Sequence, residues 1–168
     1  PGNTMTVEKV VLNIWSEYPS QDVTLKFYED NNGKPGNIIT TLNNIVPISQ
    51  DVIGEAHGYI IYEVVLDIDP ITFEGGGNGK NYWLSTGITS SWNGKRVFWE
   101  STTEPGIGSD IHFSVVGGTW NLHPEYNAVF KLLCEDEPAS NDDYCTVEPS
   151  GSVIPMTRLV FNNVDNIS

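Results

Sequence analysis

Apolar side chains alternate with polar ones along much of this chain, and this two-residue period predicts β-strands. Val10, Leu12 and Ile14 form one face of the first such run. Further strand-like runs lie at residues 23–28, 60–66, 82–84, 97–99, 111–113 and 128–133. The run from residue 60 is expected to end at Asp67–Pro70. No stretch keeps a helical period over ten residues, so we expect an all-β protein.

The number and spacing of these runs predict the architecture. About eight strands in roughly 130 residues, with a turn every ten or so, are typical of an antiparallel β-sandwich of the jelly-roll type. Asn93-Gly94 between two strand-like runs is a strong hairpin signal. We assign residues 1–134 to this β-sandwich. Residues 135–155 are acidic and rich in Pro and Ser, as in a linker.

The last segment, residues 156–168, alternates again in MTRLVFNNVDNIS. It is too short to be a domain. We interpret it as the first strand of a following domain or as an edge strand added to the sandwich. The opening residues PGNTM read like the edge of a linker. We therefore expect the chain to be a piece of a longer, multidomain protein.

The stretch DNNGKPG, residues 30–36, could be a calcium loop or a turn. An EF-hand loop needs an oxygen ligand at its fifth position and Gly at its sixth, where Lys34 and Pro35 stand. Lys34-Pro35-Gly36 suits a turn instead, so we predict a loop that joins two sandwich strands. A structural Ca²⁺ held by loop carbonyls stays open. Asp30 and Asn32 are the side chains that we name for it.

The charge balance limits the possible partners. The net charge is −14, and residues 134–168 hold seven acidic residues against one Arg. Without a basic patch to neutralise phosphates, we expect no nucleic-acid binding. No run approaches the roughly 18 apolar residues of a membrane span, so we expect no membrane insertion. An acidic surface suits an exported bacterial protein, either secreted or displayed on the cell surface.

Two cysteines, Cys134 and Cys145, flank the acidic segment EDEPASNDDY. A polar loop closed by two Cys suits a disulfide, and a disulfide favours an oxidising compartment. The alternative is two unpaired thiols. Two cysteines alone cannot make a zinc site.

Catalytic motifs are not apparent. Three histidines are scattered along the chain: His57, His112 and His123. They lack the spacing of metal ligands, so we expect structural or surface roles, with His112 in a strand and the other two in loops. A glycosidase would need two carboxylates close together, and Glu100, Glu104 and Asp110 are candidates. In a small acidic domain such groups are usually just solvated, so we expect no enzyme activity.

Tryptophans are more informative. Trp83 and Trp99 lie within strand-like runs and are expected to pack in the core. Two others lie in expected loops, where an indole ring beside amide and carboxylate groups can bind a sugar. The predicted ligand site consists of Trp92, Asn93, Trp120, Asn121, His123 and Tyr126. The alternative is that each loop Trp plugs one end of the sandwich.

Several motifs together resemble a known module. They are VTLKFYEDNNGKPGNIITT, IIYEVVLDI, KNYWLSTGI, RVFWES and NAVFKLLCE. They are similar to the galactose-binding-like jelly rolls appended to adhesins, proteases and glycan-degrading enzymes of exported bacterial proteins. The resemblance covers residues 5–134. It implies a non-catalytic accessory module, often with a structural Ca²⁺.

The tail YCTVEPSG…IPMTRLVFNNVDNIS is similar to the opening strand of the GEVED domains of large secreted Bacteroidetes proteins. The expected function is therefore that of an accessory module that binds a polysaccharide or surface glycan and serves neighbouring domains of its own chain. Two alternatives remain open: a structural spacer or adhesin domain without a small ligand, and a glycan-degrading enzyme domain.

Overall fold

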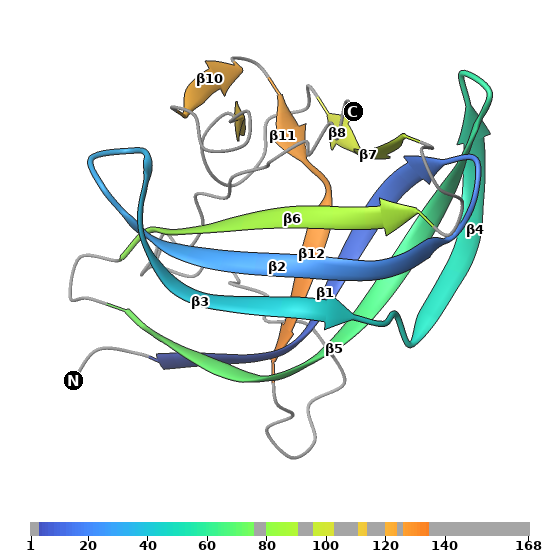
Figure 1. Cartoon of the computed structure of the whole chain (residues 1–168). Coiled ribbons are helices and arrows are strands. Elements are labelled where there is room, and N and C mark those ends of the chain that lie inside the picture. Colours follow the sequence, from blue (N-terminus) through green and yellow to red (C-terminus); the bar gives the residue numbers. More distant parts are fainter. Residues whose placement is uncertain are drawn as a thin grey trace, which may run out of the picture.

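The computed structural model confirms an all-β, antiparallel sandwich (Figure 1). The residues that it describes are 4–75, 80–90, 96–102, 111–113, 120–123 and 126–134. Within these ranges there is no helix, and each strand pairing is antiparallel. The two-residue period therefore predicted the fold class correctly.

The larger sheet is built around the first strand of the chain. Its order is β12-β1-β5-β4, and β7 also pairs with β1. The bounds are β1 (Thr4–Ser16), β4 (Ser49–Ala56), β5 (Tyr59–Glu74), β7 (Val97–Trp99) and β12 (Phe130–Cys134). β12 pairs with the middle of β1 and β7 with its end, so both lie along the same edge of β1.

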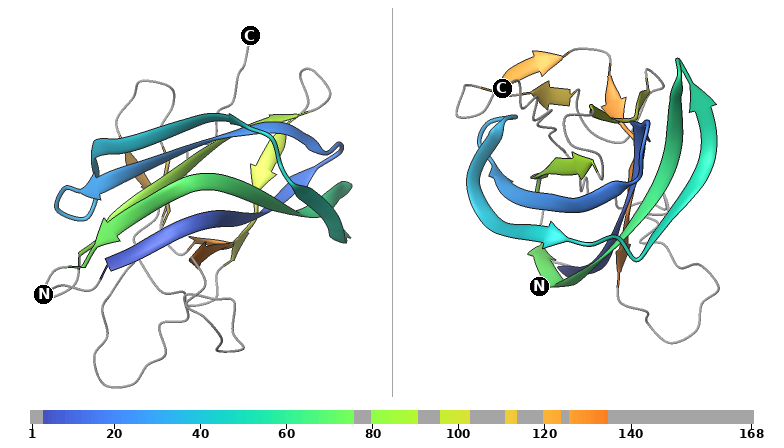
Figure 2. Two further views of the ribbon diagram at one scale, coloured as in Figure 1. Left: turned by 90° about the horizontal axis from the view of Figure 1, so that it is seen from below. Right: turned by 45° about the vertical axis from the view of Figure 1, so that its right-hand side comes forward.

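The smaller sheet has three strands in the order β3-β2-β6. Its bounds are β2 (Ser20–Asp30), β3 (Pro35–Ile45) and β6 (Tyr82–Ser90). Two further pairs lie outside these sheets: β9 (Ile111–Phe113) with β10 (Asn121–His123), and β8 (Ser101–Thr102) with β11 (Asn127–Ala128). Figure 1 shows the smaller sheet in front of the larger one, and Figure 2 gives two further views.

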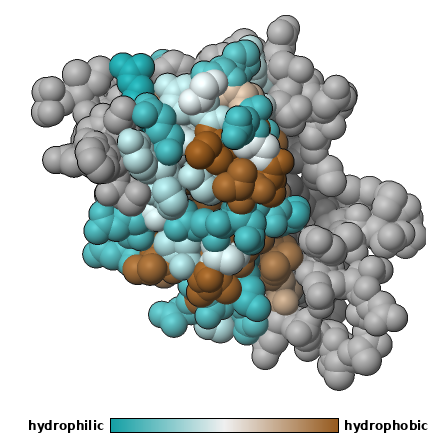
Figure 3. Space-filling model, turned by 90° about the vertical axis from the view of Figure 1, so that its right-hand side faces the viewer, coloured by the Kyte–Doolittle hydropathy of each residue, from teal (hydrophilic) through white to brown (hydrophobic). Residues whose placement is uncertain are grey.

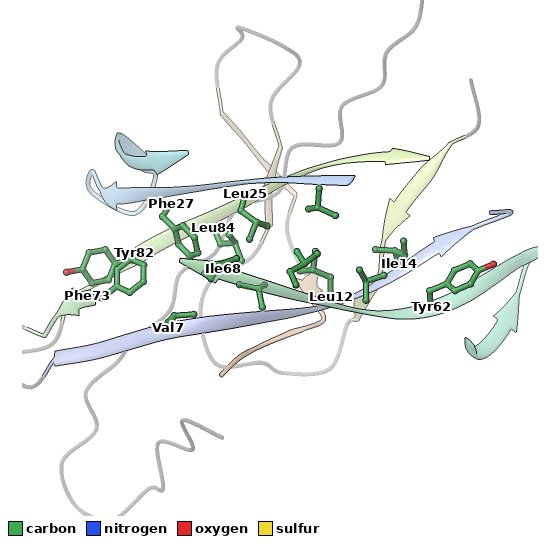
Figure 4. Packing of buried hydrophobic residues seen from close by; sticks show 14 residues of the cluster. Val7, Leu12, Ile14, Leu25, Phe27, Tyr62, Ile68, Phe73, Tyr82 and Leu84 are labelled. Atoms are coloured by element: carbon green, nitrogen blue, oxygen red, sulfur yellow. The ribbon is translucent and has the colours of Figure 1, made fainter. Parts of the chain in front are cut away.

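The main core fills the space between the two sheets. The chain passes from one sheet to the other after β1, β3, β5 and β6, so that both sheets draw on all parts of the described sequence. Side chains of alternate residues interleave there, and Figure 4 shows Leu12 and Ile14 of β1 opposite Leu25 and Phe27 of β2. Every second residue of each strand points into this core, so the residues between them form the outer faces of the two sheets.

Polar groups join the strands that share the edge of β1. The Asn13 side chain donates a hydrogen bond to a Glu100 carboxylate oxygen at 2.7 Å, and the Glu100 backbone N–H donates to the Asn13 carbonyl at 2.8 Å. The Trp99 indole donates to the Val129 carbonyl at 2.8 Å. Trp99 thus packs against the main core with its polar atom satisfied, as expected from the sequence.

The prediction that the run from residue 60 ends at Asp67–Pro70 is wrong. β5 continues through Pro70 to Glu74. A register shift makes this continuation tolerable, because Val7 pairs with Ile71 while Lys9 pairs with Asp67. Such a β-bulge accommodates a proline, which has no N–H to donate to the ladder.

Strand β4 had no counterpart among the predicted runs. Its sequence SQDVIGEA lacks regular alternation, and Gly54 faces Ile61 across another register shift. A tight turn at His57-Gly58 joins β4 to β5, and both residues have positive φ (52° and 83°). This is the backbone of a two-residue hairpin turn, formed here without the usual Asn-Gly pair.

The predicted linker, residues 135–155, and the predicted last strand, residues 156–168, lie outside the described residues. Cys134 ends β12 and is not a free thiol. Cys145 also lies outside the described residues, so the Cys134–Cys145 pairing stays a prediction.

Candidate functional site

The structure describes only some of the predicted ligand residues. Trp92 and Asn93 lie outside the described residues. Trp120 directly precedes β10, and Asn121 begins that strand. Tyr126 directly precedes β11 and is 38% exposed. The structure describes these three residues, and the contacts of Trp120 position it against the smaller sheet.

The expectation that His123 lies in a loop is wrong. Its backbone ends β10, where it pairs with Ile111 of β9. The stretch NLH is too short for a periodic signal, and only its pairing with IHF makes it a strand. The side chain of His123 lies outside what the structure describes. His112 lies in β9, as expected.

The outer face of the smaller sheet carries a row of large side chains. In β2, Val23, Leu25 and Phe27 face the main core, so Tyr28 faces outward. Tyr28 pairs with Trp83 of β6 on one side and with Ile38 of β3 on the other. A row of apolar groups therefore crosses all three strands.

Trp120 covers part of this row. Tyr28 and Trp83 are almost fully buried, and Trp120 is partly buried against them. The rings of Tyr28 and Trp120 meet edge to face, with centroids 5.8 Å apart and planes at 86°, a favourable geometry for aromatic pairs. We call Tyr28, Trp83 and Trp120 the outer aromatic cluster.

Two hydrogen bonds satisfy the polar atoms beneath Trp120. The Trp83 indole N–H donates to an Asp30 carboxylate oxygen at 2.7 Å. The hydroxyl groups of Tyr28 and Ser85 lie 3.2 Å apart and form a buried hydrogen bond. Both rings are thus fixed in orientation, and the cluster offers Trp120 a rigid support.

The stretch that was open between a calcium loop and a turn forms a hairpin turn. Residues 31–34 connect β2 to β3, and the second oxygen of Asp30 accepts a hydrogen bond from the Gly33 N–H at 3.1 Å. The positive φ values fall on Asn32 (54°) and Gly33 (79°). The turn is therefore centred earlier than predicted, because Pro35 and Gly36 already belong to β3.

At Gly36 the constraint is the space around the residue and not its φ. A Cβ at this position would lie 3.0 Å from the Asn31 Cβ and 3.1 Å from the Glu29 carbonyl oxygen. A larger residue would therefore require these neighbours to shift by a few tenths of an ångström. The sequence predicted the importance of Pro35 and Gly36 but assigned them to the wrong structural role.

The calcium prediction for Asp30 and Asn32 stays a prediction. In the turn, both Asp30 oxygens accept N–H hydrogen bonds, and the Asn32 amide donates to the Asn31 side-chain oxygen at 3.3 Å. Among the described residues, no group of three or more His, Cys, Asp or Glu side chains is arranged to hold a metal. Asp30 therefore acts first as the acceptor that holds Trp83.

Of the other groups considered for chemistry, Glu100 and His57 have structural partners. The Glu100 carboxylate binds the Asn13 amide, whereas Glu104 and Asp110 lie outside the described residues. His57 is exposed in its turn and its ring stacks on Trp15, with centroids 5.6 Å apart. In the part of the chain that the structure covers, no helix is long and apolar enough to cross a membrane.

The sequence analysis missed Tyr28, Ser85 and the outward position of Trp83. The signal was present, because Phe27-Tyr28 and Tyr82-Trp83-Leu84 place large apolar or aromatic side chains on both faces of their strands. Such runs indicate strands that are covered on both faces. Trp83 is buried as expected, but in the outer aromatic cluster and not in the main core.

Comparisons with known proteins add no assignment. The chain matches no family model, no curated protein and no solved structure.

Proposed function

We propose that this β-sandwich is a non-catalytic accessory module that binds carbohydrate through the surface around Trp120. The observation that carries the proposal is a partly exposed indole supported edge to face by Tyr28 on a rigid sheet. A sugar ring presents C–H groups on its faces, which pack on an aromatic ring. Its hydroxyls need polar partners at the side of that ring.

Polar partners are close at hand in the same region. A carboxylate has about four lone-pair sites, and the bonds from Trp83 and Gly33 use two of those of Asp30. Asp30 is partly exposed, so it retains capacity to accept a hydroxyl hydrogen bond. Asn121, next to Trp120, is exposed and adds an amide that can donate or accept. A secreted or cell-surface location would bring the module into contact with such glycans.

The test is binding of a panel of polysaccharides to the full chain, by glycan array followed by titration calorimetry. Trp120→Ala should weaken binding by at least about tenfold, because it removes the stacking surface. Trp120→Tyr should keep most of the affinity. Trp99→Phe is the matched control, since Trp99 packs against the main core and should not affect binding. Equal binding by wild type and Trp120→Ala would remove the proposed site.

A structural spacer or adhesin domain is the second candidate function. It is favoured by the partial burial of Trp120, because a ring that covers Tyr28 and Trp83 also serves as a plug. Failure of the wild-type chain to bind any glycan, together with a loss of stability in Trp120→Ala, would support this reading. Repeating the titration with Ca²⁺ and with a chelator tests the calcium prediction separately.

A further inference from the structure

A second surface exposes apolar side chains at the edge of the sandwich. Val46 and Ile48 of the β3–β4 connection are 71% and 60% exposed, and Val52 and Ile53 of β4 are 61% and 51% exposed. We call these four residues the open-edge patch. They make up half of the eight large apolar residues exposed in the described part of the chain. Figure 3 views this side and shows hydrophobic surface gathered between hydrophilic residues.

The backbone is also open along this side. β4 is the last strand of the larger sheet and β3 is the last strand of the smaller one, in the order that the described strands define. In the right panel of Figure 2, the β4–β5 hairpin stands at the margin of the molecule. An edge strand presents unpaired N–H and C=O groups, which can pair with another extended chain.

This edge is held in place rather than left loose. The Gln50 side-chain oxygen accepts hydrogen bonds from the Ser20 N–H at 2.7 Å and from its hydroxyl at 2.8 Å. The Gln50 amide in turn donates to the Ser20 carbonyl at 2.9 Å. Three hydrogen bonds thus fix the start of β4 to the start of β2, and the tight turn at His57-Gly58 fixes its other end. A pre-organised edge costs little ordering entropy on binding.

The charges along the edge are all negative. Asp51 and Glu55 of β4 are exposed, and neither forms a hydrogen bond or ion pair within the described residues. Residues 35–79 contain six acidic residues and no Lys or Arg. Glu63 of β5, by contrast, has a cationic partner, since the Lys131 Nζ lies 3.0 Å from a Glu63 carboxylate oxygen. The carboxylates of β4 therefore have no cation beside them among the described residues, and a partner that carries Lys or Arg could supply one.

We propose that the free edge of β4 binds an extended segment of a partner polypeptide in which Lys or Arg alternates with apolar residues. Main-chain pairing would add a strand to the larger sheet. The register shift within β4 places Asp51 and Glu55 on opposite faces of the strand. The cations on one face of the bound segment would meet Asp51, and the apolar side chains on its other face would cover the open-edge patch. Charge complementarity selects this partner over a second copy. Pairing β4 with β4 of another copy would bring four carboxylates onto one short ladder, in a chain of net charge −14.

The first test uses the full chain and a set of octapeptides, the length of β4. An alternating Lys-Val peptide should bind in calorimetry, and its affinity should fall as salt is raised. An alternating Glu-Val peptide should bind at least about tenfold more weakly. A Lys-Val peptide N-methylated at every residue should also lose about tenfold, because neither of its edges can then donate the N–H groups of a strand ladder.

The second test uses charge reversal at the edge. The variant Asp51→Lys should reverse the preference between the two peptides. Glu29→Lys, on a central strand of the smaller sheet, is the matched control and should leave it unchanged. Absence of binding, equal affinity for both peptides, or no effect of N-methylation would each overturn the proposal. So would a β4-mediated dimer of the free chain in analytical ultracentrifugation.

Discussion

The outer aromatic cluster and the open-edge patch both place apolar side chains outside the main core, but they differ in how these are covered. In the cluster, Tyr28 and Trp83 are buried beneath Trp120 and their polar atoms are hydrogen-bonded. In the patch, Val46 and Val52 remain more than half exposed. The cluster thus contributes to the stability of this chain. The patch contributes little, which is why we interpret it as a surface for another chain.

The difference follows from sheet position. The cluster lies over β2 and β6, which are neighbours within the smaller sheet, so that a segment from late in the chain can cover their outer face. The patch lies at the free margin of both sheets, where no described segment follows. Similar side chains therefore have different energetic weight in the two places. The following predictions test this contrast from the largest expected effect to the smallest.

Replacing the buried indole should have the largest effect. Trp83 is 0% exposed, so Trp83→Ala should lower the free energy of unfolding by about 3–5 kcal/mol through lost burial and the cavity left behind. Chemical denaturation of the purified chain measures this. Ile53→Ala in the open-edge patch is the comparison and should change it by less than about 0.5 kcal/mol. Similar losses in both variants would contradict the distinction between the two regions.

Removing the acceptor of the indole should have an intermediate effect. Asp30→Ala leaves the Trp83 N–H and the Gly33 N–H without their partner and should cost about 1–3 kcal/mol. Combining it with Trp83→Phe, which removes the indole N–H, should cost less than the sum of the two single changes. Strict additivity in this double-mutant cycle would show that the hydrogen bond does not stabilise the cluster.

The smallest effect is expected at an exposed position of β4, and a matched substitution at a buried position of β5 is compared with it. Val52→Thr in β4 places a hydroxyl where the side chain is 61% exposed, so the free energy of unfolding should change by less than about 0.5 kcal/mol. Val64→Thr in β5 makes the same change at a fully buried position and should cost about 1–3 kcal/mol. Thermal unfolding of both variants compares them directly. An equal loss would mean that the edge of β4 is covered.

The sequence predicted the strands whose alternation is driven by the main core. β1, β2 and most of β5 turn Val, Leu, Ile and Phe inward at every second position, and burial enforces that period. β4 escaped detection because an edge strand buries little and its alternation is weak. The full length of β5 escaped because a bulge, which depends on the pairing with β1, accommodates Pro70.

For the candidate site, the sequence singled out Trp120 and Asp30 but placed them in separate roles. Only the fold brings Asp30 to the Trp83 indole and Trp120 to Tyr28, because these contacts join residues more than fifty positions apart. Side-chain chemistry is local and can be read from the sequence, and so can the two-residue period that defines an all-β sandwich. Which outer faces are covered, and which edges remain open, depends on long-range strand order, which the tertiary structure alone decided.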